Sequence, residues 1–404
     1  MAVGYQGLPR LHPVAGIEVA TLSAGIKKPG RRDLVLFSLA QGSSVAAVFT
    51  RNAFCAAPVV VAREHLSQAT PRYLLINTGN ANAGTGSPGL RDARESCARL
   101  SMQMSCHPEE VLPFSTGVIG EPLPLQKIID TLPAFPAALQ ADGWEDAAHG
   151  IMTTDTVAKG ASRQLELDGK LVTITGIAKG SGMIRPDMAT MLAYVATDGQ
   201  VPQPLLQQCL NESVKHSFNR ITVDGDTSTN DACVLMASGQ SGVSIEPDGV
   251  NYTRFAEAVG EVCRELAQLI VRDGEGATKF ISIEVNGGSD EAECEQVAYT
   301  IAHSPLVKTA LFASDPNWGR ILAAVGRAGV NGLDLEALSI YLGDVCIVRD
   351  GGRAAEYHEE LGQAVMARDE ITIRVELARG EASAVLWTCD FSYDYVRINA
   401  EYRT

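Results

Sequence analysis

The sequence has no closely spaced cysteines or histidines. Its nine cysteines and seven histidines are spread over 404 residues, without a Cys-x-x-Cys pair and without a His-x-x-x-His or His-Glu-x-x-His pattern. Zinc sites usually take two ligands from such a short stretch, and paired cysteines are typical of secreted chains. We therefore expect no metal ion and reduced, mostly buried thiols.

Long apolar runs and an excess of basic residues are also missing. No run approaches the roughly 18 apolar residues of a membrane span, and the first ten residues lack the basic and apolar regions of a signal peptide. With 33 Lys and Arg against 48 Asp and Glu, the net charge is -15, which repels nucleic acid and anionic membranes. These absences predict a soluble, cytoplasmic protein with neither nucleic acid nor a membrane as partner.

What is present is a globular composition with alternating strand and helix patterns. Hydrophobic residues make up 46% and charged residues 20% of the chain, which is typical of folded proteins. Apolar runs between glycine turns predict strands in the first 120 residues. A period of three and four residues predicts a helix over 253–272, which Asp273 and Gly274 end. Further helices are expected over 122–140, 204–218 and 291–310.

The second half of the chain indicates a separate, smaller domain. Strand patterns return after Lys279, and the turn cluster at 286–290 is a plausible boundary. We expect an α/β protein with a main catalytic domain over 1–282 and a smaller α/β domain over 283–404. The last residues, 394–404, alternate too regularly for a disordered end, so the tail is expected to dock on folded protein.

Two glycine-rich stretches do not predict nucleotide binding. Gly84–Gly89 has the glycine spacing of a dinucleotide site, but it lies well beyond the strand predicted to end at Asn77 and contains Pro88. Lys179–Gly182 places its lysine before the glycines, unlike a phosphate-binding P-loop. A Gly-x-Ser-x-Gly pattern is also absent. The sequence therefore does not indicate a dinucleotide-dependent enzyme, a nucleoside triphosphatase or a serine hydrolase with a nucleophile elbow.

The most informative point of the chain is the bond between Ala189 and Thr190. A loop with glycines and a proline, starting at Lys179, leads directly into an apolar run that begins at Thr190. Cleavage of this bond would place a free α-amine beside the Thr190 hydroxyl, and this amine would serve the nucleophile as its base. The alternative is an ordinary β-branched residue that opens a strand.

Four other positions could complete such a site. Thr116 and Gly117, in the loop Ser115–Gly120, could direct a hydroxyl and an N–H at a developing oxyanion. Glu275 lies between two glycines just after a helix end, and Lys179 could bind a substrate carboxylate. Each has an ordinary alternative, which is a plain turn for the first pair and a solvated side chain for Glu275 and Lys179.

Taken together, these segments resemble the glutamate N-acetyltransferases of arginine biosynthesis, also called ornithine acetyltransferases. The resemblance covers essentially the whole chain, and the stretches that carry it are Ala15–Gly16, Gly25–Lys28, Val48–Thr50, Asn77–Gly84, Ser115–Gly120, Thr153–Asp155, Lys179–Asp198, Asp224–Asp231, Asp273–Thr278 and Asp315–Arg320. It implies a layered α-β-β-α sandwich-like core with an N-terminal-nucleophile-type active site, plus a smaller C-terminal α/β domain.

The resemblance implies a self-processing acetyltransferase. The chain would cleave itself between Ala189 and Thr190 into an α chain of residues 1–189 and a β chain of residues 190–404, which stay together as an α2β2 assembly. The Thr190 hydroxyl would then carry the acetyl group of N2-acetyl-L-ornithine to L-glutamate as an acetyl-Thr190 ester, in a ping-pong mechanism without a cofactor. Use of acetyl-CoA as a second acetyl donor stays open.

The resemblance also assigns roles to single residues. Thr116 and Gly117 would form the oxyanion hole. One departure from the family pattern is Asp187, where asparagine is more familiar, and its carboxylate could change the processing rate or the local field. Substrate would be bound by six residues, namely Thr153, Lys179, Thr190, Glu275, Asn399 and Thr404.

Two other functions stay open from the sequence. A hydrolase of the amidohydrolase or aminopeptidase type could use the same architecture with water in place of glutamate, and the fold alone does not separate the two. A non-catalytic binding or scaffold protein could also have kept the fold. The presence of Thr190 together with its supporting residues favours an enzyme over a scaffold.

Overall fold

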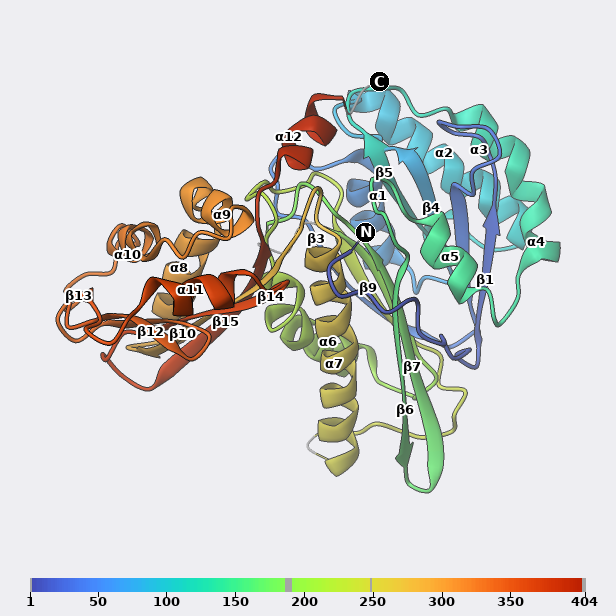
Figure 1. Cartoon of the computed structure of the whole chain (residues 1–404). Coiled ribbons are helices and arrows are strands. Elements are labelled where there is room, and N and C mark those ends of the chain that lie inside the picture. Colours follow the sequence, from blue (N-terminus) through green and yellow to red (C-terminus); the bar gives the residue numbers. More distant parts are fainter. Residues whose placement is uncertain (1, 186–190, 248, 402–404) are drawn as a thin grey trace. The chain divides into compact units, whose positions relative to one another are not determined.

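The chain forms two compact units. The computed structural model describes residues 2–185, 191–247 and 249–401 (Figure 1). The larger unit comprises Gly7–Asn219 and Asp226–Ile270, and the smaller unit comprises Met1–Gln6, Arg220–Gly225 and Val271–Thr404.

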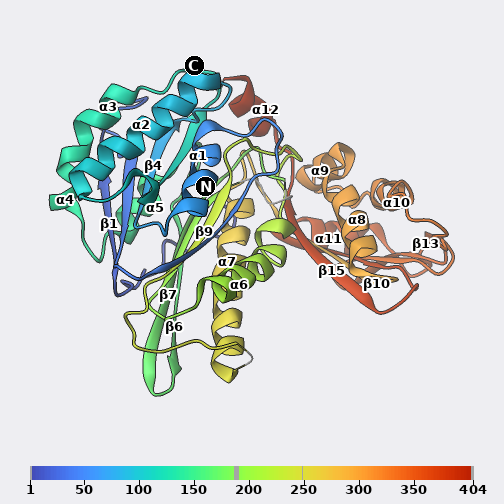
Figure 2. The same ribbon diagram turned by 180° about the vertical axis from the view of Figure 1, so that it is seen from behind.

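A four-stranded sheet with the order β1-β2-β4-β5 forms one part of the larger unit. Its strands are β1 (Ile17–Leu22), β2 (Leu34–Leu39), β4 (Tyr73–Asn80) and β5 (Val111–Val118). β2 is antiparallel to β1 and β4, whereas β4 and β5 are parallel. Parallel neighbours need a crossover connection, and the helix α2 (Gly86–Met104) provides it (Figure 2). The carboxyl ends of β4 and β5 therefore meet at the same edge of this sheet.

A five-stranded sheet with the order β3-β9-β8-β7-β6 forms the other part of the larger unit. Its strands are β3 (Ser44–Phe49), β6 (Lys159–Leu167), β7 (Lys170–Lys179), β8 (Leu192–Thr197) and β9 (Ala232–Ala237). Only β8 and β9 are parallel among these pairs. All residues of β8 and β9 are buried, as expected for central strands that are covered on both faces.

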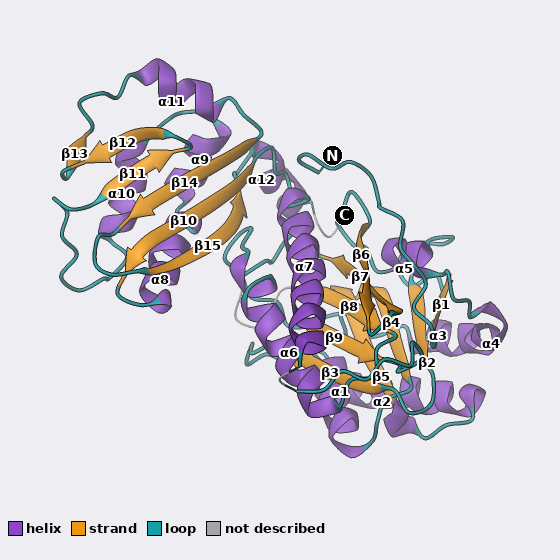
Figure 3. Cartoon of the chain, turned by 90° about the horizontal axis from the view of Figure 1, so that it is seen from below, coloured by secondary structure: helices purple, strands orange, loops and turns teal. Residues whose placement is uncertain are grey.

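Helices cover both sheets of the larger unit. They are α1 (Ala57–Gln68), α2, α3 (Leu125–Thr131), α4 (Phe135–Ala138), α5 (Trp144–Gly150), α6 (Gln203–Lys215) and α7 (Val250–Arg272), with the short 3-10 turns η1 (Pro108–Glu110), η2 (Leu132–Ala134) and η3 (Phe218–Arg220). α1 and α2 pack on β5, and α6 packs on β3 and β9. Figure 3 shows α6 and α7 beside the five-stranded sheet.

Aromatic side chains join the two sheets of the larger unit. The ring of Phe37 in β2 lies 5.3 Å from that of Tyr194 in β8, and Phe114 in β5 meets Tyr194 edge-on at 5.4 Å. Trp144 of α5 meets Phe37 in the same manner at 5.4 Å. Such pairs add to the burial of the rings and prefer these geometries. The two sheets therefore share one core, which fixes their strand ends relative to each other.

The smaller unit contains a third sheet, with the order β13-β12-β11-β14-β10-β15. Its strands are β10 (Phe280–Gly288), β11 (Ser339–Leu342), β12 (Val345–Arg349), β13 (Gly352–Arg353), β14 (Glu370–Glu376) and β15 (Ala382–Cys389), and its helices are α8 (Glu291–Ala302), α9 (Pro305–Phe312), α10 (Trp318–Gly326), α11 (Glu359–Met366) and α12 (Tyr393–Ala400). β10 and β14 are parallel, and the other pairs are antiparallel. Three mixed sheets with helices confirm the prediction of an α/β protein.

Single elements agree with the sequence patterns to different degrees. The predicted helix over 253–272 is α7, so that prediction is confirmed. The tail, which the sequence predicts to be ordered, forms the helix α12 over Tyr393–Ala400. Of the helices that the structure describes, none is long and apolar enough to cross a bilayer.

Candidate active site

The carboxyl end of β5 carries Thr116 and Gly117 in a backbone conformation that requires glycine. Gly117 has φ +136°, and a Cβ atom there would lie 2.3 Å from the Gly79 carbonyl carbon and 2.5 Å from the Asn80 nitrogen of β4. Side chains larger than hydrogen do not fit so close to a neighbouring backbone. The backbone of β5 therefore lies directly against that of β4 at Gly117, next to the buried side chain of Thr116.

Lys179, the last residue of β7, brings two hydroxyl groups together. Its Nζ donates hydrogen bonds to Thr116 Oγ1 at 2.9 Å and to Thr153 Oγ1 at 3.1 Å. A hydroxyl oxygen that accepts from an ammonium keeps its own hydrogen for another acceptor. The structure thus places three of the sequence-predicted residues in one cluster, with a positive charge and two O–H groups that suit an anionic ligand.

A buried carboxylate, Asp155, holds the loop beside this cluster. It accepts hydrogen bonds from the backbone N–H groups of Thr153 and Gly180, both at 2.8 Å, and from Lys159 Nζ at 2.6 Å. Burial opposes ionisation of Asp155, but the Lys159 and Lys179 ammonium groups and these hydrogen bonds outweigh it and hold the pKa of the carboxyl well below its usual range. The charge of Asp155 thus fixes both the Thr153 loop and the chain that follows Lys179.

The start of β8 lies against the start of β9. The backbone N–H of Ala232 donates to the carbonyl oxygen of Met191 at 3.0 Å. Just before Ala232, the carboxyl group of Asp231 is buried, and its Oδ2 has no hydrogen-bond partner among the described residues. Burial raises the pKa of Asp231 well above its usual value, although Ser228 and Lys179 favour the ionised form.

Four predicted positions lie outside the described residues. They are Asp187, Ala189, Thr190 and Thr404. The hypotheses of a cleavage site, of a threonine nucleophile and of a substrate-binding C-terminus therefore remain predictions.

In the smaller unit, Glu275 and Asn399 lie together. Asn399 Nδ2 donates to Glu275 Oε2 at 2.9 Å. The loop that bears Glu275 follows α7, and buried Asp390 accepts the backbone N–H groups of Thr278 and Lys279 at 2.8 and 2.9 Å. The α12 tail and the Glu275 loop are thus parts of one hydrogen-bonded assembly, as the docking prediction for the tail requires.

Sequence reasoning assigned no role to Asp155, Asn230 or Asp231. All three are buried polar residues inside stretches that resemble the family. Asn230 Nδ2 donates to the carbonyl oxygens of Ala81 and Ser115 at 2.6 and 2.9 Å. Their place inside stretches that carry the family resemblance is the signal that the sequence offers, because their partners lie far away in the sequence.

These observations define an α/β protein whose larger unit gathers a lysine and two threonine hydroxyls at adjoining strand ends. Within residues 2–185, 191–247 and 249–401, no group of three or more His, Cys, Asp or Glu side chains is placed to hold a metal ion. The chain belongs to the ArgJ family, whose model matches residues 18–404.

Relatives of full length support the same assignment. The chain is 59% identical over 406 residues to the arginine biosynthesis bifunctional protein ArgJ of Pseudomonas syringae pv. tomato, with 100% of both chains covered. It is 60% identical over 396 residues to the protein of the same name from Methylococcus capsulatus, with 98% of this chain and 97% of that one covered.

Solved structures also match parts of the chain. The arginine biosynthesis bifunctional protein ArgJ from Bacillus halodurans is 41% identical, covers 52% of this chain and 99% of its own, and has a TM-score of 0.50. An ornithine acetyltransferase from Mycobacterium tuberculosis in complex with ornithine is 32% identical, covers 44% of this chain and 97% of its own, and has a TM-score of 0.39.

Proposed function

We propose that this protein is an acetyltransferase of arginine biosynthesis that moves the acetyl group of N2-acetyl-L-ornithine to L-glutamate. The observation that carries the proposal is the cluster in which Lys179 Nζ joins the hydroxyls of Thr116 and Thr153 beside Gly117 with its positive φ. Membership in the ArgJ family and full-length relatives that are bifunctional arginine biosynthesis proteins support it.

The proposed chemistry is a ping-pong transfer through an ester. The Thr190 hydroxyl attacks the acetyl carbonyl, and its proton passes to the α-amine of the same residue, whose ordinary pKa of about 7.7–8.0 suits a base near neutrality. The Thr116 hydroxyl and the Gly117 N–H stabilise the tetrahedral oxyanion. Ornithine leaves with the proton, and the amine of glutamate then attacks the acetyl-Thr190 ester.

The nucleophile arises by self-processing in this proposal. The Thr190 hydroxyl attacks the carbonyl carbon of Ala189, the peptide becomes an ester, and water hydrolyses that ester. The products are an α chain of residues 1–189 and a β chain of residues 190–404 that assemble as α2β2. The proposed architecture is a layered α-β-β-α core of the N-terminal-nucleophile type, with a catalytic domain over 1–282 and a smaller domain over 283–404.

Substrate recognition uses charges of both signs. Lys179 pairs with a carboxylate of the amino-acid substrates, and Thr153 and Thr190 contact the acyl end. Glu275, held by Asn399, binds an ammonium group of the amino-acid substrate, and Thr404 closes the amino-acid pocket. The reaction needs no cofactor, and acetyl-CoA is the proposed second acetyl donor.

The test is ornithine release from acetylornithine with and without glutamate. The proposal expects release that depends on glutamate and is matched by equal amounts of acetylglutamate. Release at the same rate without glutamate would show an amidohydrolase instead. On a denaturing gel, the wild-type protein should give two bands and Thr190→Ala one band, and an uncleaved, inactive wild-type chain would favour a scaffold. Acetylglutamate formed from acetyl-CoA and glutamate alone would establish the second donor.

A further inference from the structure

The site of the larger unit is assembled from two different sheets. Thr116 and Gly117 lie near the end of β5 in the four-stranded sheet. Lys179 ends β7 and Met191 precedes β8 in the five-stranded sheet. An oxyanion hole works only when its donors are fixed relative to the nucleophile to a fraction of an ångström. A contact that ties these strand ends together therefore matters for the reaction.

Asn230 makes such a contact. It lies two residues before β9, the strand that runs parallel to β8. Its Nδ2 donates to the carbonyl oxygen of Ser115 at 2.9 Å and to that of Ala81 at 2.6 Å, and its Oδ1 accepts from Thr229 Oγ1 at 2.6 Å. Both amide hydrogens and the amide oxygen are thus used in a buried position, so the side chain has one defined orientation.

The Ser115 carbonyl is the part of β5 that controls the oxyanion donors. It belongs to the peptide group that links Ser115 to Thr116, so its direction sets the plane from which the Thr116 side chain extends. The Gly117 N–H lies in the following peptide group. A hydrogen bond from Asn230 to the Ser115 oxygen therefore restrains Thr116 directly, and Gly117 through one further peptide group, relative to β9.

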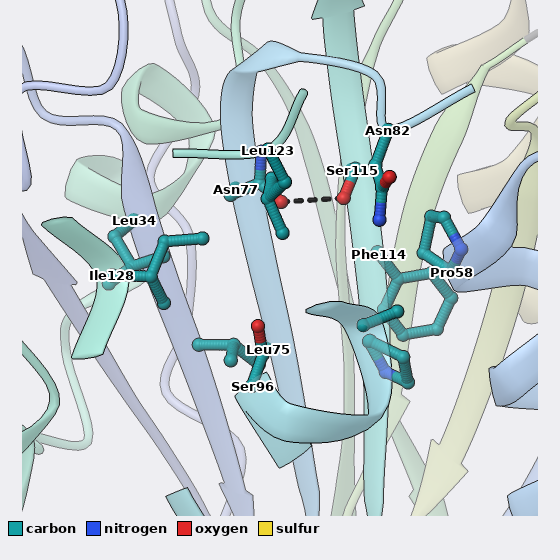
Figure 4. A pocket seen from close by; sticks show the side chains of 12 residues that line it. Leu34, Pro58, Leu75, Asn77, Asn82, Ser96, Phe114, Ser115, Leu123 and Ile128 are labelled. Carbon is teal, nitrogen blue, oxygen red and sulfur yellow. Dashed lines mark hydrogen bonds between the residues drawn. The ribbon is translucent and has the colours of Figure 1, made fainter. Parts of the chain in front are cut away.

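Further hydrogen bonds hold this end of β5. A cavity lies beside it, lined among others by Asn77, Phe114 and Ser115 (Figure 4). Beside this cavity, Ser115 Oγ donates to Asn77 Oδ1 at 2.5 Å, and Asn77 Nδ2 donates to the Asn80 carbonyl at 2.9 Å.

We propose that Asn230 is a positioning residue, which ties the oxyanion strand β5 to the β8–β9 strand pair by donating hydrogen bonds to Ser115 and Ala81. This role rests on the proposed function. It does not require Asn230 to touch the substrate. Its loss should slow the chemical step and leave substrate binding largely intact, because the binding groups Lys179 and Thr153 have their own support from Asp155.

The diagnostic variant is Asn230→Asp, which keeps the shape of the side chain but turns a two-hydrogen donor into an acceptor that faces two carbonyl oxygens. The matched control is Asn211→Asp at an exposed position of α6, where Oδ1 accepts from Gln207 Nε2 at 3.0 Å and a carboxylate can still accept. Asn230→Ser, which keeps one donor, is the milder second variant in case Asn230→Asp does not fold.

The measurement is kcat and KM of acetyl transfer in the full-length protein, with the melting temperature and the band pattern recorded for each variant. We expect kcat of Asn230→Asp to fall about 10- to 100-fold, KM to stay within about twofold, and Asn230→Ser to lie between it and the wild type. Asn211→Asp should match the wild type. A folded Asn230→Asp or Asn230→Ser protein with wild-type kcat, or a loss confined to KM, would overturn the positioning role. A wild-type protein without glutamate-dependent transfer would overturn the proposed function itself, and this role with it.

Discussion

At the scale of single residues, the buried carboxylate of Asp155 next to the site is balanced by an ion pair and by hydrogen bonds. Asp155 and Lys159 are both fully buried and lie 2.6 Å apart. Removing one partner of a buried ion pair leaves the other charge without compensation, which costs far more than the pair itself contributes. The backbone N–H groups of Thr153 and Gly180 depend on the same carboxylate, so Asp155 links stability to the shape of the site.

Asp155→Asn should therefore destabilise the protein strongly. We expect a loss of about 3–5 kcal/mol, which lowers the Tm by roughly 10 °C. Scanning calorimetry at pH 7 checks this, with the exposed Asp142→Asn as control. Because the pKa of Asp155 is lowered in the folded state, its stabilising contribution is present above the unfolded value of 3.8 and is lost as the pH falls through the lower, folded value. An Asp155→Asn protein as stable as the control would contradict this account.

Asp231 should have the opposite pH dependence. Its folded-state pKa is raised by burial, so the folded protein holds the proton more tightly than the unfolded chain, and stability falls as the pH rises from 3.8 towards the folded value. Asp231→Asn has no ionisable group and escapes this loss. The Tm of Asp231→Asn minus that of the wild type, measured by calorimetry, should be larger at pH 8 than at pH 5. The same Tm difference at both pH values would rule this account out.

How much of the site the sequence predicts depends on how local the signal is. Thr116 and Gly117 lie in a glycine-containing stretch, for which the sequence predicts a loop but which forms the last part of β5. Glu275 lies between two glycines, so local patterns indicate all three residues. For Lys179 the sequence left open a solvated side chain, whereas its Nζ bonds to two hydroxyls in the structure. Asn230 has its partner Ser115 a full 115 residues away, and no local pattern can reveal that contact.

At the scale of elements, the spacing of apolar residues predicts the bounds of a helix well where no proline interrupts it. α7 has an uninterrupted apolar face, and the sequence predicts it within a few residues. The region 122–140 instead forms α3, η2 and α4, with Pro133 and Pro136 at the starts of the last two. The region 291–310 divides into α8 and α9 at Ser304, which caps α9 by accepting from the Val307 N–H. A proline lacks the N–H of a helix interior and so begins a new helix instead.

The tail helix α12 is the element whose removal best separates fold from function. None of its residues is buried, whereas its residue Asn399 donates to Glu275. A chain that ends at Ser392 loses little apolar burial, so its Tm should stay within about 4 °C of the wild type. A hydrogen bond to a charged group is worth about 1.5–3 kcal/mol, so kcat/KM of acetyl transfer should fall about 10-fold or more.

The matched point variant for this truncation is Asn399→Ala, which keeps α12 and removes only the amide. It should reproduce most of the loss in kcat/KM. Full activity of both proteins in the same transfer assay would show that the tail has no part in the site.

At the scale of the whole molecule, the strand order explains how a cleaved chain can stay in one piece. In the five-stranded sheet, β3, β6 and β7 precede the proposed cleavage site at 189/190, and β8 and β9 follow it. β9 pairs with β3 on one side, and β8 pairs with β7 on the other. The two strands of the proposed β chain thus fill the middle of a sheet whose outer strands belong to the proposed α chain.

Separation of the two chains would therefore open two six-residue strand pairings and expose a central core. β8 and β9 are buried along their whole length, and each Val or Leu side chain returned to water costs about 1.5–3 kcal/mol. We expect the cleaved wild-type protein to elute from a sizing column in native buffer at the same volume as uncleaved Thr190→Ala. In denaturant, the wild-type sample alone should resolve into two chains. Native elution of the wild-type fragments as two separate species would contradict this prediction, because an interleaved sheet cannot release one chain and keep its core.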